Sequence, residues 1–312
     1  MASFAILGTG AVGGYYGGLL AKSGREVHFL VRSDYAHVRD HGLRVDSPRG
    51  DFRLPRVHAY AHAEEMPVCD VAVLAWKTTE NARLAEMLPR VVKPGGTVLV
   101  LQNGLDPERE AAQAAPGARI LGGLCFLCAR KEGPGWIRHL DYGTVTLAAF
   151  APGGPLGVTP GMLALGEEFT AAGVEFRMHE DWAAARWRKL VWNIPFNGLC
   201  ALLGKNTAQI LREPAWRDRA AALMDEVMAG SALNGCALPP GFRDRMLKDT
   251  DAMAPYEPSM KLDRDARRPM ELEAIYARPL RAIAEAGGAA PGIAALYAEL
   301  LRLDSGRPEA GR

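Results

Sequence analysis

Residues 3–32 have the sequence SFAILGTGAVGGYYGGLLAKSGREVHFLVR, which is the most informative segment for predicting the fold. The apolar runs over 3–8 and 26–32 predict two strands. The segment between them, over 12–22, predicts a helix. A strand, a helix and a second strand in this order are typical of a βαβ unit with two parallel strands.

The turn between the first strand and the helix carries three glycines in the spacing G-x-G-x-x-G. Gly8 permits the tight turn, Gly10 lets a pyrophosphate approach the backbone, and Gly13 lets the helix pack closely on the strand. The helix also presents unpaired N–H groups and the positive end of its dipole to phosphates. A glycine-rich surface turn is the alternative, but the strand–helix–strand context favours dinucleotide binding. The predicted contacts are Gly8, Thr9, Gly10, Ala11, Val12 and Gly13.

The rest of the first half continues the alternation, which predicts a parallel sheet wound by helices. The predicted strands are 3–8, 26–32, 70–75, 97–101 and 119–124, and the predicted helices are 12–22, 34–41, 80–91 and 106–114. Pro94–Gly96 predicts a turn ahead of a strand. Two β-like runs, over 127–150 and 174–178, predict a mixed edge to the sheet, and the Pro/Gly-rich residues 151–160 between them predict a loop.

From about residue 181 the sequence changes character. The runs 182–204, 214–234 and 271–302 have helical period and use Leu, Ala and Met where strands would use Val and Ile. The fold class is therefore α/β, with a Rossmann-type dinucleotide-binding domain over 1–180 followed by an all-α helical domain over 181–312. The apolar runs 214–234 and 289–302 would suit a homodimer through the helical domain, and core packing explains them equally well.

The bulk composition excludes several classes of protein. A chain of 312 residues is long for one core, which favours two domains. A net charge of +1 gives no reason to expect nucleic acid as a partner, and charges interrupt every apolar run that could cross a membrane. Only the last residues, SGRPEAGR, have the composition of a disordered tail.

The five cysteines are sparse and odd in number, as expected of reduced thiols in a cytoplasmic protein. Cys125 and Cys128 form C-x-x-C inside the apolar run LGGLCFLCA. Zinc or redox chemistry would need a second cysteine pair or a histidine cluster nearby. We therefore predict packed strand residues here and no metal site.

Arg32 stands where the second strand ends and bears on the choice of dinucleotide. NAD-specific folds place Asp or Glu there, to bind the ribose 2′-hydroxyl. A guanidinium instead favours the 2′-phosphate of NADP. Two alternatives stay open: Arg32 is a solvated strand-end residue, or Asp34 reaches the ribose.

Three polar side chains share one face of the helix predicted over 182–204. Lys189, Asn193 and Asn197 follow at spacings of four, a drift of about 40° per step. Apolar residues cover much of the remaining surface, so the face is expected to be buried, which is costly unless something polar meets it. Taken alone, a lysine that reaches water and two asparagines that cap loops explain the pattern equally well. Pro195 between the two asparagines predicts a kink or an end of this helix.

Several segments together form one ordered series. The glycine turn and Arg32 are followed by Lys77 in VAVLAWKTTE and by Asn103 in LQNG. K-L-V-x-N-x-x-x-N, P-S-M-x-x-D and E-L-E-A continue the series. This order resembles the ketopantoate reductase family (2-dehydropantoate 2-reductases and their relatives) from the first strand to about residue 285.

The resemblance implies roles for individual residues. Lys189 corresponds to the general acid and Glu271 to the carboxylate that orients the substrate hydroxyl. Asn103 corresponds to the residue between nicotinamide and substrate. Arg32 and Lys77 match cofactor contacts, and the substrate-holding positions are matched by Asn193, Asn197 and Ser259.

The implied reaction is reduction of a 2-oxo acid by NADPH, most simply 2-dehydropantoate to (R)-pantoate in pantothenate biosynthesis. Domain 1–180 would then bind NADP, domain 181–312 would carry the catalytic residues, and the active site would lie in the cleft between them. Adding hydride to a ketone develops an alkoxide, which needs a proton donor. Burial lowers the pKa of a lysine from about 10.4 towards neutral pH. Pro269 predicts a helix start that places Glu271 in the first turn, where the dipole favours a carboxylate. Asp263 is expected to support the loop after it.

Two positions depart from the family pattern. Tyr256 and Thr207 stand near places where the family has asparagine. The departures fit a reductase of a different 2-oxo acid or ketone. They fit neutral sequence variation within a ketopantoate reductase equally well. A non-catalytic NADP-binding regulator is the alternative from another class, and the Lys189/Glu271 pair argues against it.

Overall fold

The computed structural model describes residues 1–306, so most of the polar terminal stretch SGRPEAGR lies outside the described residues. The chain forms two compact units. One comprises Met1–Gln102 and Pro107–Trp182, and the other comprises Asn103–Asp106 and the chain from Ala183 onward.

The first unit is built on one mixed sheet. Its path runs β4-β3-β9-β8-β7-β6-β1-β2-β5, and β10 pairs with β9. The strands are β1 Ser3–Leu7, β2 Glu26–Leu30, β3 Leu43–Asp46, β4 Phe52–Leu54, β5 His58–Tyr60, β6 Cys69–Leu74, β7 Val92–Val100, β8 Arg119–Gly133, β9 Trp136–Ala149 and β10 Phe176–Met178. Strands β5, β2, β1, β6, β7 and β8 are parallel, and β9 runs antiparallel to β8.

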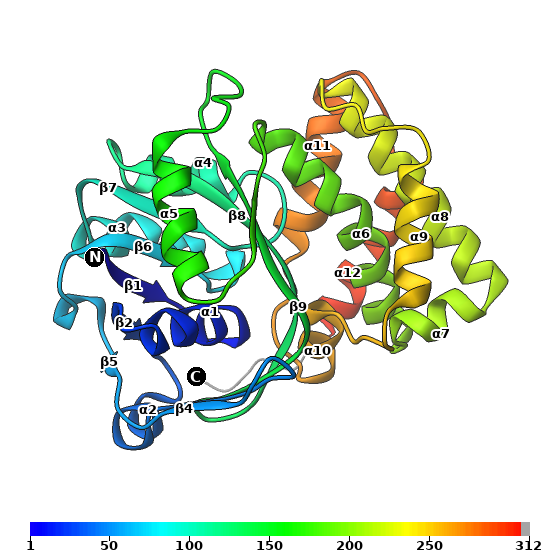
Figure 1. Cartoon of the computed structure of the whole chain (residues 1–312). Helices are drawn as coiled ribbons and strands as arrows, with labels where there is room; N and C mark the ends of the chain where they lie inside the picture. Colours follow the sequence, from blue (N-terminus) through cyan, green and yellow to red (C-terminus); the bar gives the residue numbers. More distant parts are fainter. Residues whose placement is uncertain (307–312) are drawn as a thin grey trace. The chain divides into compact units, whose positions relative to one another are not determined.

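Helices cover both faces of this sheet (Figure 1). Helices α1 and α5 pack on one face, and α3 and α4 pack on the other. Tyr16 of α1 and Phe169 of α5 meet at 6.2 Å between ring centroids. The helical segments of this unit are α1 Ala11–Lys22, α2 Tyr35–His41, η1 Ala63–Glu65, η2 Thr78–Arg83, α3 Leu84–Val91, α4 Pro107–Ala114 and α5 Pro160–Ala171.

The predicted strands and helices of the first half are confirmed with three local corrections. The helix predicted over 80–91 is divided into η2 and α3. Pro94–Gly96 lies inside β7, where the pairing register with β6 shifts, and so does not precede the strand. Strand β9 borders β3 and is not at the edge, although the sheet is mixed there as predicted.

Helix α5 and three short strands were not predicted. Thr159 caps α5 by accepting a hydrogen bond from the Met162 N–H, and Pro160 occupies the first turn. This Thr-Pro pair is a recognised helix-start signal inside the stretch that the sequence assigned to a loop. Strands β3, β4 and β5 have three or four residues each, too few for a periodic pattern.

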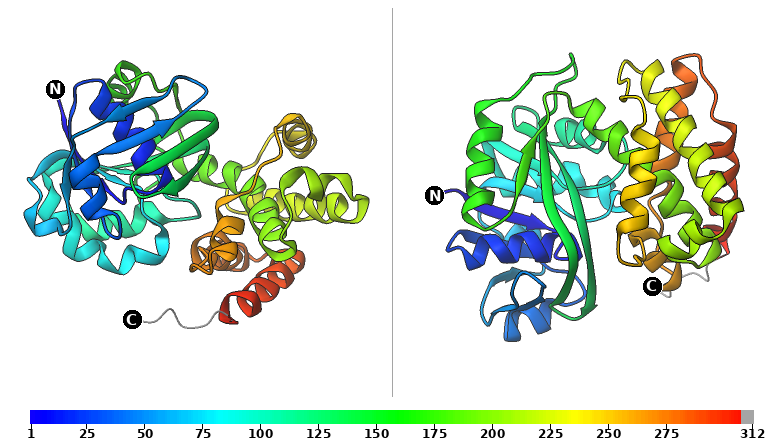
Figure 2. Two further views of the ribbon diagram at one scale, coloured as in Figure 1. Left: turned by 90° about the horizontal axis from the view of Figure 1, so that it is seen from below. Right: turned by 45° about the vertical axis from the view of Figure 1, so that its right-hand side comes forward.

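The second unit is all helical in its described part, which confirms the predicted class (Figure 2). Its elements are α6 Trp182–Leu203, α7 Thr207–Arg212, α8 Pro214–Leu233, α9 Phe242–Ala252, α10 Ser259–Asp265, η3 Glu273–Ala277, α11 Arg278–Glu285 and α12 Pro291–Ser305. Helix α6 does not end at Pro195 but continues through it to Leu203. Ile194 and Phe196 of α6 are fully buried in the core of this unit.

No helix within residues 1–306 has the length and apolar character needed to cross a membrane.

Candidate functional site

The glycine turn has the geometry that a pyrophosphate requires. Gly8 has a φ of +102°, and a Cβ there would lie 2.5 Å from the backbone nitrogen of Trp76. A Cβ on Gly13 would lie 2.1 Å from the Gly8 carbonyl oxygen, so α1 packs directly on the turn. A Cβ on Gly10 would meet nothing within 4 Å. The open side of the turn is therefore at Gly10, where a ligand can approach the backbone.

The start of α1 suits an anion. Gly10 is the N-cap, and neither a capping side chain nor an acidic residue occupies the first turn. Ala11 and Val12 are half-buried there. The Thr9 hydroxyl donates to the Leu30 carbonyl at 3.0 Å, which holds the turn against β2. The N–H groups and dipole of α1 thus remain available to phosphate.

Arg32 and Asp34 follow β2 and differ sharply in their surroundings. The Arg32 side chain is 77% exposed, and its guanidinium lies 3.0 Å from Glu80. Asp34 is paired with Lys131 and accepts a hydrogen bond from the Gly135 N–H at 3.0 Å. Burial raises the pKa of Asp34, but these hydrogen bonds outweigh it and leave the pKa below its usual value. Because this carboxylate is committed elsewhere, Arg32 is the better candidate for the ribose end of the cofactor.

Lys77 caps η2 just after β6, and its ammonium nitrogen is buried. The neighbouring Trp76 indole donates to Asn81 Oδ1 at 3.1 Å. The Gln102 amide donates to the Trp76 carbonyl at 3.1 Å and to Asn81 Oδ1 at 2.6 Å. This network fixes the backbone against which Gly8 packs. The network was not predicted from the sequence, because Gln102 is 26 positions from Trp76 and 21 from Asn81.

In the helical unit, Lys189, Asn193 and Asn197 form the predicted polar face of α6. They are only 8%, 5% and 3% exposed. Lys189 therefore does not extend its side chain into solvent, which removes one of the alternatives. The Asn193 Nδ2 group has no hydrogen-bond partner among the described residues. A buried amide donor without a partner is costly, and a polar ligand would remove that cost.

Glu271 is 7% exposed, but its place in the local structure differs from the prediction. Helical structure begins at Leu272, not at Pro269, and Ile275 N–H bonds the Glu271 carbonyl at 3.2 Å. Glu271 is therefore the N-cap residue. The next residues, Glu273–Ala277, form a π-helical turn, a feature frequent at functional sites. The buried Tyr276 hydroxyl donates to the Ile194 carbonyl at 2.8 Å and so fixes this helix against α6.

Asn103 belongs to a short segment that packs with the helical unit. A Cβ on Gly104 would lie 2.5 Å from Ala274 Cβ, and the Leu105 N–H donates to the Ala274 carbonyl at 2.9 Å. The Arg278 guanidinium donates to the Leu105 carbonyl at 3.2 Å. Asn103 is thereby held close to the helix that follows Glu271.

Ser259 is the first residue of α10 and is half-buried. Four residues on, Asp263 accepts a hydrogen bond from the Arg268 guanidinium at 3.0 Å. The Arg268 N–H also donates to the Asp263 carbonyl at 2.8 Å. Asp263 thus supports the loop after α10, as predicted.

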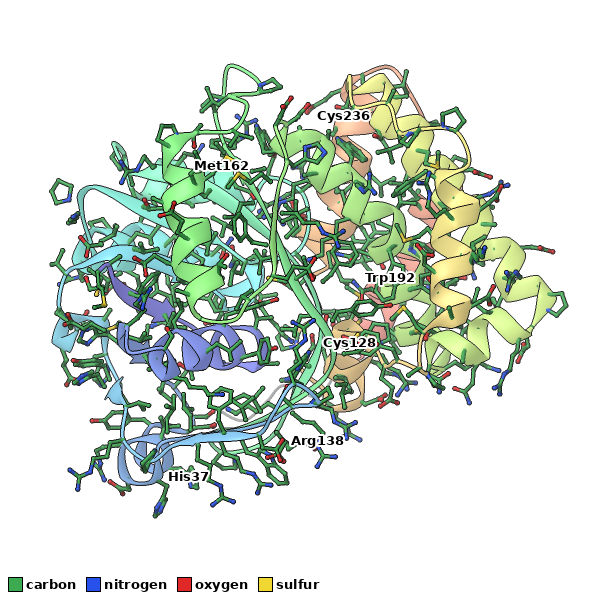
Figure 3. All side chains as sticks on the ribbon, viewed as in Figure 1. His37, Cys128, Arg138, Met162, Trp192 and Cys236 are labelled. Atoms are coloured by element: carbon green, nitrogen blue, oxygen red, sulfur yellow. The ribbon has the colours of Figure 1, made fainter. Side chains whose placement is uncertain are left out.

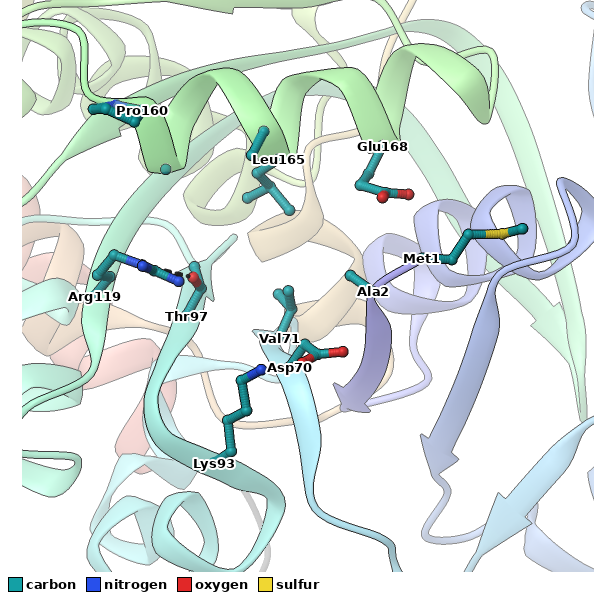
Figure 4. Close-up of a pocket in the computed structure, with 12 residues that line it drawn as sticks. Met1, Ala2, Asp70, Val71, Lys93, Thr97, Arg119, Pro160, Leu165 and Glu168 are labelled. Carbon is teal, nitrogen blue, oxygen red and sulfur yellow. Dashed lines mark hydrogen bonds and ion pairs between the residues drawn. The ribbon is translucent and has the colours of Figure 1, made fainter.

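A separate hollow of about 470 Å³ lies around the amino-terminal ends of β1, β6 and β8 (Figure 4). Its ionisable groups are mostly satisfied within the protein. Lys93 pairs with Asp70, and Glu168 pairs with Arg25. The hollow contains none of the predicted site residues.

Cys125 and Cys128 are buried residues of β8, as predicted. Burial raises the pKa of Cys128 to about 12, so this thiol stays protonated. Within residues 1–306 no cluster of His, Cys, Asp and Glu could hold a metal ion.

The fold and the glycine turn are those of a dinucleotide-dependent oxidoreductase. Residues 4–152 match the family described as ketopantoate reductase PanE/ApbA, and residues 181–303 match its C-terminal part. The chain therefore belongs to the ketopantoate reductase family, which confirms the resemblance seen in the sequence.

Relatives with full-length similarity agree. The chain is 48% identical to a 2-dehydropantoate 2-reductase of Nostoc sp. over 310 residues, which are 99% of this chain and 97% of that protein. The crystal structure of 2-dehydropantoate 2-reductase from Geobacter metallireducens matches with a TM-score of 0.92 and 42% identity, covering 96% of this chain and 99% of the other. The crystal structure of 2-dehydropantoate 2-reductase from Methylococcus capsulatus matches with a TM-score of 0.86 and 34% identity. The match covers 99% of this chain and 100% of the other.

Proposed function

We propose that this protein reduces 2-dehydropantoate to (R)-pantoate with NADPH, a step of pantothenate biosynthesis. The reaction transfers hydride to the ketone of a 2-oxo acid and gives a 2-hydroxy acid. Family membership and the 48% identity to the Nostoc enzyme support this substrate.

The observation that carries the proposal is the buried polar face of α6. Lys189 and Asn193 are at least nine-tenths buried, and the Asn193 amide nitrogen has no partner among the described residues. A 2-oxo acid offers a carboxylate and a ketone oxygen, which are the acceptors that an ammonium and an amide bind. The face therefore suits this class of substrate.

The remaining roles follow from the chemistry of hydride addition. Negative charge develops on the ketone oxygen, and Lys189 donates a proton to it. Glu271 accepts a hydrogen bond from the substrate hydroxyl and orients the molecule. The other proposed substrate contacts are Asn103, Asn193, Asn197 and Ser259.

The residues of the first unit fit NADPH, which supplies the hydride when it is bound. The turn Gly8–Gly13 would hold the pyrophosphate, since Gly10 leaves its backbone open. Arg32 would bind the 2′-phosphate, and Lys77 would contact the cofactor near the end of β6. Asn103 would stand between nicotinamide and substrate.

A panel assay tests the proposal. Oxidation of NADPH and of NADH is followed with 2-dehydropantoate and with linear, branched and aromatic 2-oxo acids. We expect the highest kcat/KM for 2-dehydropantoate with NADPH. A clear preference for another oxo acid would show a paralogous reductase. NADPH binding without turnover of any carbonyl would show a regulator.

We further propose a cytoplasmic homodimer that associates through the helical unit. Leu233 of α8 and Leu301 of α12 are 51% and 44% exposed and offer apolar surface. The five cysteines are free thiols, as in reducing compartments. Sedimentation velocity of the wild type and of Leu301→Glu tests this assembly, because a dimer through α12 should dissociate in the variant.

A further inference from the structure

Trp192 is a half-buried aromatic residue of α6 beside the polar face, and its ring lies near that of the half-buried Tyr256. At about 100° per residue, Trp192 lies about 60° from Lys189, on the side away from Asn193 and Asn197. Its ring centroid is 6.3 Å from that of Tyr256. Trp192 lies between α6 and α9 (Figure 3), where its indole donates to the Thr250 hydroxyl at 3.1 Å.

Hydrogen bonds hold the Trp192 indole and the main chain of Tyr256 in place. Thr250 in turn donates to the Met246 carbonyl at 2.7 Å, which fixes the acceptor of the indole hydrogen bond. The Tyr256 N–H donates to the Thr207 hydroxyl at 3.1 Å, and the Thr207 N–H donates to the Tyr256 carbonyl at 3.0 Å. Thr207 is only 1% exposed. The two positions where this chain departs from the family pattern are thus bonded to each other.

The Thr207 contacts use only the main chain of residue 256. The loop between α9 and α10 is therefore fixed whatever side chain stands there, and the same loop leads within three residues to Ser259. An aromatic ring at 256 gives this border of the polar face an apolar surface, which an asparagine would not provide.

We propose that Trp192 and Tyr256 form the apolar side of the substrate site and select for the two methyl groups on carbon 3 of 2-dehydropantoate. The inference rests on the proposed function. A hydrophobic contact discriminates between substrates that differ by one or two methyl groups by about tenfold to a hundredfold. Thr207 acts as a positioning residue, because it touches the loop and not the substrate.

The test compares kcat/KM for 2-dehydropantoate and for 4-hydroxy-2-oxobutanoate, which lacks both methyl groups. In Tyr256→Ala we expect kcat/KM for 2-dehydropantoate to fall about tenfold or more, and that for the linear acid to change less than about threefold. Tyr256→Leu, which keeps an apolar side chain, should restore most of the preference and also serves if the alanine variant folds poorly. Trp216→Ala is the matched control, since this half-buried aromatic residue lies on α8.

The outcomes separate the two claims. If Tyr256→Ala lowers kcat/KM equally for both acids, or for neither, the ratio of the two kcat/KM values is unchanged. That result would overturn the inference and leave the reductase assignment intact. A wild-type protein that does not turn over 2-dehydropantoate would overturn both. Thr207→Val should raise KM for 2-dehydropantoate with little change in kcat. Thr207→Ser, which keeps the hydroxyl, should have a KM near the wild-type value. A Thr207→Val loss confined to kcat would contradict the positioning role.

Discussion

At the scale of single residues, the side chains proposed for the chemistry are polar groups that the structure buries. Lys189, Asn193, Asn197 and Glu271 are all less than 9% exposed in the helical unit. Burying such polar groups costs free energy, and the Asn193 Nδ2 group has no hydrogen-bond partner among the described residues. Their type and spacing were visible in the sequence, but their burial was not.

Lys189→Ala should lower kcat about a hundredfold to ten-thousandfold, because the alkoxide loses its proton donor. The dissociation constant of NADPH, measured by fluorescence titration, should stay near the wild-type value. Lys205→Ala is the control, since this lysine of the same unit pairs with Glu213. Near-normal turnover in Lys189→Ala would exclude the general-acid role.

Arg32→Ala should raise the dissociation constant of NADPH about tenfold or more and leave that of NADH nearly unchanged. A charge-assisted hydrogen bond to the 2′-phosphate is lost, and NADH has no such group. Arg83 serves as the matched control, because it lies 3.7 Å from the same Glu80 carboxylate. If Arg32→Ala weakened both cofactors equally, Arg32 would not select NADPH.

At the scale of elements, the strand–turn–helix at the N-terminus was predictable because its rules are local. The start of the helix at Leu272 was not, since Pro269 is a plausible first-turn residue and no simple sequence pattern announces a π-helical turn. The packing of Gly104 on Ala274 was also invisible, because it joins residues 170 positions apart.

Alanine substitutions at Gly10 and Gly13 should have different effects on the stability of the fold. A Cβ at Gly10 meets open space, so Gly10→Ala should keep the melting temperature of the free protein and weaken NADPH binding. A Cβ at Gly13 meets the Gly8 carbonyl at 2.1 Å, so Gly13→Ala should destabilise the fold by about 1–3 kcal/mol. Thermal melts and NADPH titrations of both variants decide this. Equal destabilisation by the two would contradict the assignment of Gly10 to the ligand.

At the scale of the whole molecule, the fold class and the family followed from motifs whose order spans most of the chain. Short strands such as β4, with three residues, carried too little pattern to be found. The hydrogen bonds between Thr207 and Tyr256 depend on tertiary contact, so the sequence showed only that both positions depart from the family.

The cysteines should behave as core residues. Burial raises the pKa of Cys69 to about 11 and that of Cys200 to about 12, so their thiols are protonated and unreactive at pH 8. We expect slow reaction with Ellman's reagent in the native protein and five rapid equivalents in guanidinium chloride. Rapid reaction of Cys125 and Cys128 in the native state would revive a redox role for that pair.

The transfer of hydride itself provides the most direct test of the reductase assignment. The protein is incubated with 2-dehydropantoate and NADPH that carries deuterium at the transferable position, and the product is analysed by chiral chromatography and mass spectrometry. We expect (R)-pantoate with one deuterium on carbon 2. Absence of pantoate, or formation of (S)-pantoate, would contradict the reductase assignment. So would pantoate that contains no deuterium with either of the two NADPH forms labelled on opposite faces of the nicotinamide.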